Sequence, residues 1–234
     1  MFWCVFHLEF VFFRGRLGTH IIVLTQTEVD KTGKSYYGES NLYYMATAGN
    51  YDCRVVLGMS LSLGLFLLVY VGVDKEGPIH DLAWSPNSKE FIVIYGCRDF
   101  FTLFRLIWYL LVMPAKATLF DHRANKVHDF GQFPRNFVRF NPHGRVICIA
   151  GFGNLAGQVD FWDRKTLKQI AQVDASGSAA CEWSPCGRYI MTATLSPRLR
   201  VDNGYKIWHY TGTLVHQREI SELYQVCLFS KRSG

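Results

Sequence analysis

The chain lacks the residue patterns on which most enzymes and metal proteins depend. Its seven cysteines include no close-set pair of the kind that binds zinc, and its histidines show no spacing that would put two on one helix face. It contains no Gly-x-Ser-x-Gly elbow and no paired-carboxylate pattern. We therefore expect no enzyme activity, no metal or cofactor and no small-molecule substrate. The absence of Asn-x-Ser/Thr sequons, together with the scattered cysteines, predicts a reduced intracellular protein.

Two glycine motifs approach nucleotide-binding fingerprints but are incomplete. Lys31-Thr32-Gly33-Lys34-Ser35 ends like a phosphate-binding loop, yet Glu28 stands where the first glycine is required, so the backbone cradle is missing. Residues 151–157 have one residue too many for a dinucleotide fingerprint and lie between two expected strands, where that fingerprint needs a helix to follow. Both motifs are predicted to be connections between strands.

Amphipathic helices are scarce, whereas one short phrase occurs three times. Trp84-Ser85-Pro86, Phe140-Asn141-Pro142 and Trp183-Ser184-Pro185 are each followed by a turn and a run of strand-forming residues. The prolines are 56 and 43 residues apart, and removing a foreign-looking run of 16 residues, 97–112, reduces the first spacing to 40. Spacings of roughly 40 to 45 residues are typical of four-stranded propeller blades.

The repeats also agree at their far end, where a further strand closes with an aromatic residue. We predict an all-β fold, a partial WD40-like β-propeller of three to four blades, with antiparallel meanders over 77–96 and 113–217. A β-sandwich also has many short strands, but it gives no reason for a fixed period. The aromatic residues expected to pack inside the blades are Trp84, Phe140, Trp162, Trp183 and Trp208.

Two apolar runs do not fit a regular propeller. Residues 55–73 form a stretch of 19 residues without a charge, and residues 100–113 are nearly as apolar apart from Arg105. A bilayer span needs about 20 apolar residues, so the first run leaves open a membrane-anchored protein as an alternative. We expect no membrane partner, because a true span would not normally interrupt one blade of a repeat.

Several long segments resemble one protein family. They are VDKTGKSYYGESNLYYMAT (29–47), GPIHDLAWSPNSKEFIVIYG (77–96), MPAKATLFD (113–121), GFGNLAGQVDFWD (151–163) and TATLSPRLRVDNGYKIWHYTG (192–212), and they are similar to eukaryotic translation initiation factor 2A. The resemblance covers roughly residues 19–57, 74–96 and 113–226. It implies a WD40-like β-propeller of which this chain is a part.

The resemblance divides the chain into expected regions. We expect an unmatched leader over 1–18, a partial propeller over 19–226 that two apolar inserts interrupt at 58–73 and 97–112, and an unmatched tail over 227–234. The abrupt borders suggest a partial or mis-spliced gene model with intron-derived inserts. Spliced transcripts that carry both inserts in frame would contradict this hypothesis.

The resemblance also implies a non-enzymatic role in translation initiation in the cytoplasm. Members of the family help to deliver initiator methionyl-tRNA to the small (40S) ribosomal subunit in a manner that depends on the start codon of the mRNA. The basic bias of residues 113–226, with 14 Lys and Arg against 9 Asp and Glu, is compatible with an RNA partner. Candidate contacts to RNA or the ribosome are Arg135, Arg198, Arg200 and Lys206. A WD40-like scaffold that binds only proteins remains the main alternative.

Overall fold

The fold is built from short antiparallel strands. The computed structural model describes residues 8–27, 40–49, 52–55, 76–97, 115–196 and 202–228, and within these ranges every regular element is a strand. The strands form four sheets of four, in each of which neighbours in the sheet are also neighbours in the chain. The predicted all-β fold and its antiparallel meanders are thereby confirmed.

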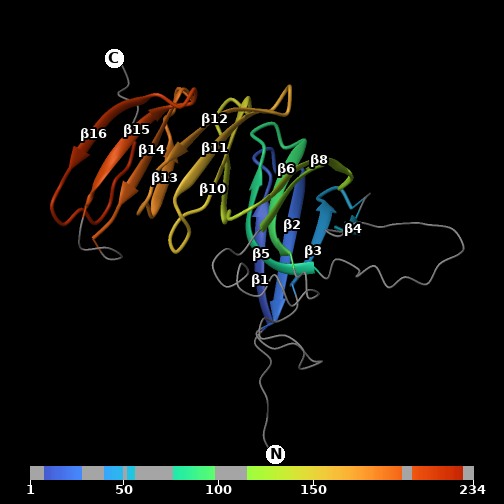
Figure 1. Ribbon diagram of the computed structural model, residues 1–234. Coiled ribbons are helices and arrows are strands. Elements are labelled where there is room, and N and C mark those ends of the chain that lie inside the picture. The colour runs from blue at the N-terminus through green and yellow to red at the C-terminus, as the bar shows by residue number, and fades with distance from the viewer. Residues whose placement is uncertain are drawn as a thin grey trace, which may run out of the picture. The chain divides into compact units, whose positions relative to one another are not determined.

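Each sheet has the strand order of a propeller blade (Figure 1). Sheet A contains β1 (Leu8–Arg14), β2 (His20–Thr27), β3 (Ser40–Ala46) and β4 (Asp52–Arg54). Sheet B contains β5 (Glu76–Trp84), β6 (Glu90–Cys97), β7 (Ala115–Asp121) and β8 (Lys126–Phe133). Sheet C contains β9 (Phe137–Phe140), β10 (Val146–Ala150), β11 (Gln158–Asp163) and β12 (Lys168–Asp174). Sheet D contains β13 (Ala180–Trp183), β14 (Tyr189–Thr194), β15 (Gly204–His209) and β16 (Leu214–Glu219).

The chain divides into two compact units, each built on a pair of sheets. Unit 1 (Met1–Trp84 and Ser88–Phe133) contains sheets A and B, and unit 2 (Ser85–Asn87 and Pro134–Gly234) contains sheets C and D. A sheet that is apolar on one face must bury that face against another layer. In unit 1 the buried cluster joins Ile22, Leu24, Leu42, Tyr44 and Val55 to Ile79, Leu82, Phe91, Val93, Tyr95 and Phe120. In unit 2 it joins Val146, Cys148, Ala150, Phe152, Val159, Phe161, Val173 and Ala175 to Trp183, Ile190 and Trp208.

One tight turn is repeated between the first and second strand of every sheet. Its fourth residue is Gly18, Ser88, Gly144 or Gly187, with φ of 70°, 54°, 74° and 68°. Left-handed backbone of this kind costs residues with a Cβ roughly 1 to 2 kcal/mol, which explains why three of the four are glycine. The turn geometry, rather than any one side chain, is therefore the constant part of the repeat.

Sheet A is a fourth copy of the repeat that the short phrase does not reveal. Its turn closes with Gly15 N–H donating to His20 O, just as Asn141 N–H donates to Val146 O in sheet C. Arg14 thus occupies the place that Trp84 has in sheet B, and Arg16 replaces the proline. The strand β1 lies within residues 1–18, which we expected to be an unmatched leader.

The aromatic residues of the other three sheets lie in matching registers. Trp84, Phe140 and Trp183 each end a first strand, and Phe120, Trp162 and Trp208 lie in the same rows on the third strands. In each of these sheets the ladder between the third and fourth strands shifts by a β-bulge at that row, which increases the local twist. Among the predicted blade residues, Phe140, Trp183 and Trp208 are buried, whereas Trp84 and Trp162 are half-buried.

The expected inserts fall largely outside the described residues. Residues 58–73 lie wholly outside them, and of residues 97–112 only Cys97, the last residue of β6, is described. In the expected tail, residues 227 and 228 follow sheet D without regular structure. No helix in the described ranges has the length and hydropathy that a membrane span requires.

Candidate nucleic-acid interface

The residues predicted to contact RNA occupy different environments. Lys206 lies in β15, half-buried, where it pairs in the ladder with Thr192 and Gln217. Arg198 and Arg200 lie outside the described residues, so their contacts with RNA remain predictions. Arg135 lies in the connection between β8 and β9 and only 3% of it is exposed.

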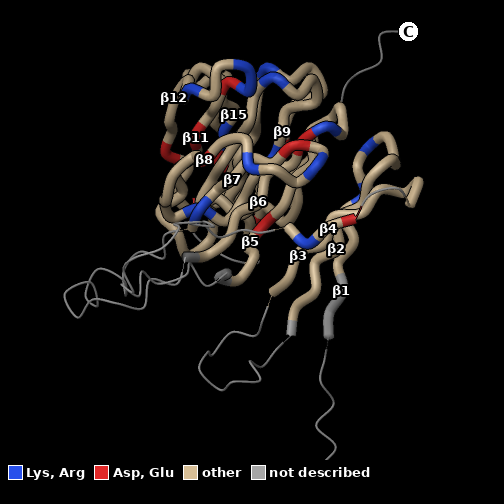
Figure 2. Tube along the Cα trace, turned by 90° about the vertical axis from the view of Figure 1, so that its right-hand side faces the viewer, with Lys and Arg blue, Asp and Glu red and all other residues tan. Residues whose placement is uncertain are grey.

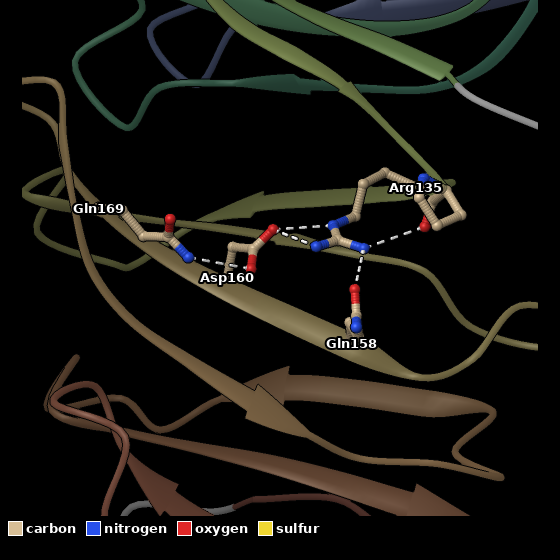
Figure 3. Close-up of polar contacts among 5 residues, drawn as sticks. Arg135, Gln158, Asp160 and Gln169 are labelled. Atoms are coloured by element: carbon tan, nitrogen blue, oxygen red, sulfur yellow. Dashed lines mark hydrogen bonds and ion pairs between the residues drawn. The ribbon is translucent and has the colours of Figure 1, made fainter.

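Arg135 is held by a hydrogen-bond network within sheet C (Figure 3). Its Nε donates to Asp160 Oδ2 over 2.8 Å and its Nη2 forms an ion pair with the same oxygen, while Nη1 donates to Gln158 Oε1 and to Pro134 O. Gln169 Nε2 donates to the second oxygen of Asp160 over 3.2 Å. The network therefore links the connection that precedes β9 to β11 and β12. The Arg135 guanidinium is enclosed by it and has no exposed face that could contact a phosphate.

A group of basic residues lies instead on the turns at one end of unit 2, which we call its hairpin end. Because hairpins alternate between the two ends of a meander, the turns 141–145, 164–167, 184–188 and 210–213 all lie at this end. Figure 2 shows Lys and Arg gathered on turns above the β12 and β15 labels. The basic residues of the hairpin end are Arg145, Arg164, Lys165, Lys168 and Arg188, of which Arg164 is half-buried and the others are exposed.

Backbone and side-chain contacts make these turns one continuous surface. Arg164 N–H donates to Arg145 O over 2.8 Å, which joins the two turns of sheet C. Asn141 Nδ2 donates to Gly187 O over 3.2 Å, and His143 Nε2 lies 3.2 Å from Cys186 O, which joins sheet C to sheet D. The cations on the three turns are therefore neighbours on a fixed framework.

Asp163 is the single acidic residue among these turns and the strand residues next to them, and its carboxylate accepts hydrogen bonds from its own turn. Its carboxylate accepts hydrogen bonds from Lys165 N–H over 3.2 Å and from the Thr166 hydroxyl over 3.0 Å. Burial acts to raise the pKa of Asp163, but these hydrogen bonds and the nearby Arg145 charge outweigh it and lower the pKa below the ordinary 3.8. The described part of the opposite end of unit 2 carries Asp174, Asp202, Glu219 and Glu222 beside Arg218. Among the described residues of unit 2, charge is thus separated between the two ends.

The hairpin end of unit 1 is also basic. It comprises the turns 15–19, 88–89 and 122–125 with their flanking residues, and its charged or ionisable bases are Arg14, Arg16, His20, Lys89, His122 and Arg123. Leu17 N–H donates to Ser88 Oγ over 3.1 Å, so the turns of sheets A and B touch. Asp121 accepts from the N–H groups of Arg123 and Asn125, as Asp163 does in unit 2.

Sequence reasoning missed these residues although the repeat contained the signal. Lys89, Arg145 and Arg188 each stand five residues after the aromatic residue of the repeated phrase, directly after the left-handed position. Reading that position across the three copies would have found them. Three of the predicted contacts, Arg135, Arg198 and Arg200, stand instead in the longer connections between strands.

The arrangement has the chemistry to bind anions. Arg and Lys side chains on adjoining rigid turns are the groups that hold phosphate oxygens in nucleic-acid complexes. Over the described ranges no three His, Cys, Asp or Glu side chains gather in a way that could hold a metal ion.

Comparison with known proteins gives a consistent match. The family model described as eukaryotic translation initiation factor eIF2A matches residues 7–62 and 67–226. The match takes in residues 7–18, 58–62, 67–73 and 97–112, which we expected to lie outside the family. A curated relative of Schizosaccharomyces pombe, eukaryotic translation initiation factor 2A, is 45% identical over 210 residues, which cover 89% of this chain and 31% of the relative. The chain thus spans about a third of that relative's length.

Solved structures show the same fold. A crystal structure described as that of the eukaryotic initiation factor is 38% identical, with a TM-score of 0.69, over 93% of this chain and 44% of the other. The β-propeller domain of the Trilobed protease from Pyrococcus furiosus gives a TM-score of 0.59 at 9% identity over 94% of this chain and 59% of the other. The four sheets are therefore blades of a partial β-propeller.

Proposed function

Because the chain belongs to the eukaryotic translation initiation factor eIF2A family, we propose that it helps to deliver initiator methionyl-tRNA to the small ribosomal subunit. In this proposal the protein acts in the cytoplasm, without catalysis of its own, at the start codon of an mRNA. The observation that carries the RNA-binding part is the hairpin end of unit 2, where five basic residues adjoin one another and the one acid beside them is engaged by its own turn.

The chemistry of this surface favours contact with the RNA backbone. Arg145 and Arg188 are exposed on turns that the Asn141 and His143 contacts hold together, so two cations are presented without a large loss of backbone freedom. Phosphate contacts position a nucleic acid but carry no base sequence. The hairpin end is therefore proposed to supply affinity, and recognition of the initiator tRNA needs further contacts.

A salt titration of tRNA binding tests the proposal. The dissociation constant of the chain for initiator tRNA is measured between low and physiological salt, for the wild type and for Arg145→Gln/Arg188→Gln. Each lost phosphate contact should reduce the slope of log K against log salt by roughly 1, so the double variant should lose a slope of about 2 together with affinity.

Arg139→Gln/Arg218→Gln is the matched control, because it removes the same charge from exposed strand positions of unit 2 outside the hairpin turns. It should leave the slope nearly unchanged. If the chain shows no salt-dependent affinity for tRNA, the alternative of a WD40-like scaffold that binds only proteins is favoured. If both double variants weaken binding equally, net charge rather than the hairpin end is responsible.

A further inference from the structure

An aromatic column runs through the core of unit 1 and ends at its hairpin end. The ring of Phe120 stacks on Phe91 with centroids 5.2 Å apart, Phe91 stacks on Tyr44 at 5.9 Å, and Tyr44 stacks on His20 at 5.3 Å. Trp84 flanks the column, 5.3 Å from Phe91 and 6.4 Å from His20. Phe120, Phe91 and Tyr44 are fully buried, whereas His20 is only half-buried. His20 is thus the ring that the column presents to solvent.

The matching place is filled differently in the two sheets of unit 2, by Val146 in sheet C and by Tyr189 in sheet D. His20 O accepts the hydrogen bond that closes the turn of sheet A, and in sheet C the acceptor is Val146 O. Val146 is buried, so an aliphatic side chain closes the core below the turn of sheet C, whereas the half-buried Tyr189 of sheet D packs edge-on against His209 at 5.5 Å. A half-exposed ring at this position is therefore not required by the fold of the repeat.

The surroundings of His20 suit an anionic ligand. The turn that carries the exposed Arg16 touches the turn that carries Lys89, through the bond from Leu17 N–H to Ser88 Oγ. On the other side the hydroxyl of Tyr44 donates to His122 O, which brings the turn 122–125 to the same place. Rings that stack on bases beside cations that hold phosphates are the usual composition of single-strand binding sites.

The His20 ring is also prepared for stacking in its neutral form. Its Nδ1 lies 2.9 Å from the Thr19 hydroxyl, which fixes the rotation of the ring. Burial, and to a lesser degree the neighbouring His122, lowers the pKa of His20 below its ordinary 6.5. At neutral pH the ring is therefore an uncharged flat surface backed by Tyr44 and Trp84.

We propose that the hairpin end of unit 1 binds an unpaired base of single-stranded RNA, with the His20 ring as the stacking surface and Arg16 as a contact to the adjoining phosphate. This inference rests on the proposed function for RNA as the partner, and it adds that unpaired rather than double-helical RNA is bound at this place. Paired bases are already stacked within a duplex and cannot reach the ring.

The test compares the full chain and His20→Ala in binding a labelled 12-nucleotide oligouridine and a 12-base-pair RNA duplex at one salt concentration. Loss of a stacking ring should weaken binding of the oligouridine roughly tenfold and leave the duplex within about twofold. His20→Phe should retain most of the single-strand affinity, and Phe133→Ala, which removes an exposed ring at the opposite end of β8, is the control. Thermal unfolding of each variant shows whether the core is intact.

The outcomes separate this inference from the proposed function. If His20→Ala weakens both ligands equally, or if His20→Phe loses as much as His20→Ala, the ring has only a structural part and the inference is wrong. If wild-type chain binds oligouridine but His20→Ala binds it equally well, the inference fails while the proposed function stands. If the wild type binds neither RNA, both fail. Arg145→Gln/Arg188→Gln should weaken both ligands, which marks the phosphate contribution of unit 2.

Discussion

The two units use the same turn but fill the space below it differently. In unit 1 the half-buried Trp84 donates its indole N–H to Phe13 O over 3.0 Å and lies against His20. In unit 2 the equivalent Trp183 is 8% exposed and packs edge-on to Phe161 at 6.0 Å. The four turns therefore share one backbone conformation, which includes a left-handed residue. The side chains below the turns differ: in unit 2 they pack in the apolar core, and in unit 1 they form part of a polar surface.

The same contrast holds for the ion pairs of the two units. Arg135 and Asp160 in unit 2 are buried at 3% and 6% side-chain exposure, whereas in unit 1 the Lys116–Asp129 pair leaves 30% of the Asp129 side chain exposed. Asp129 also has a second partner in Lys126, 3.0 Å away. Among the described residues, unit 2 thus contains an enclosed ion pair and unit 1 a shared, partly solvated one.

The largest effect is expected from truncating the two equivalent tryptophans. Trp183→Ala should lower the free energy of unfolding by about 3 to 5 kcal/mol, because it leaves a cavity in a closed apolar cluster. Trp84→Ala should cost less, because its ring is only half-buried. Urea denaturation of both variants measures the difference. If Trp84→Ala lowers the free energy of unfolding as much as Trp183→Ala or more, the core of unit 1 is no more open to solvent than that of unit 2.

The next largest effect concerns the ion pairs. Arg135→Met leaves the Asp160 carboxylate buried without its cation, so unfolding free energy should fall by about 3 kcal/mol. Lys116→Met should cost about 1 kcal/mol or less, because Asp129 keeps Lys126 and contact with water. Adding Asp160→Asn to Arg135→Met removes the unpaired charge and should recover part of the loss. Similar losses for the two single variants would contradict the assigned difference in burial.

The sequence was sufficient to predict the blades but not the surface that they carry. Proline spacing and the rows of Phe120, Trp162 and Trp208 predicted three sheets correctly, because turns and buried aromatic residues leave regular marks. The repeated phrase does not mark sheet A, because its turn keeps only the left-handed backbone at Gly18, with Arg14 and Arg16 in place of the aromatic residue and the proline. The family resemblance, which begins at residue 19, includes strands β2 to β4 of this sheet but not β1.

Burial of a charge could not be predicted from local sequence. Arg135 was expected to face RNA because it lies at a blade entry, yet its partner Asp160 comes from a strand 25 residues further along the chain. An ion pair between residues so far apart in the chain depends on the register of β11 in the sheet. No short sequence pattern around Arg135 indicates it. Conversely, Arg145 and Arg188 follow turn geometry, so the repeat itself points to them once the turn is known.

The smallest change in unfolding free energy is expected when carboxylates of the two units are protonated at acidic pH. Burial acts to raise the pKa of Asp129, but hydrogen bonds from Lys126, the Gly131 N–H and Lys116 outweigh it and hold the pKa below the ordinary 3.8. A carboxyl with a lowered folded pKa stabilises the fold fully above pH 3.8, and this contribution is lost as the pH falls through the lower folded value.

Unfolding free energy measured from pH 6 to pH 2 should therefore fall in the acid range, and Asp129→Asn should make that fall shallower by under about 1 kcal/mol. The turn residues Asp121 and Asp163 provide the matched control, because hydrogen bonds from their own turns outweigh burial and lower the pKa of each. Asp121→Asn and Asp163→Asn should change the acid limb to a similar extent in the two units. If Asp129→Asn changes the acid limb no more than these two turn variants do, the shared pair of unit 1 adds nothing beyond the hydrogen bonds of a turn, and the contrast with the enclosed Arg135–Asp160 pair becomes sharper still.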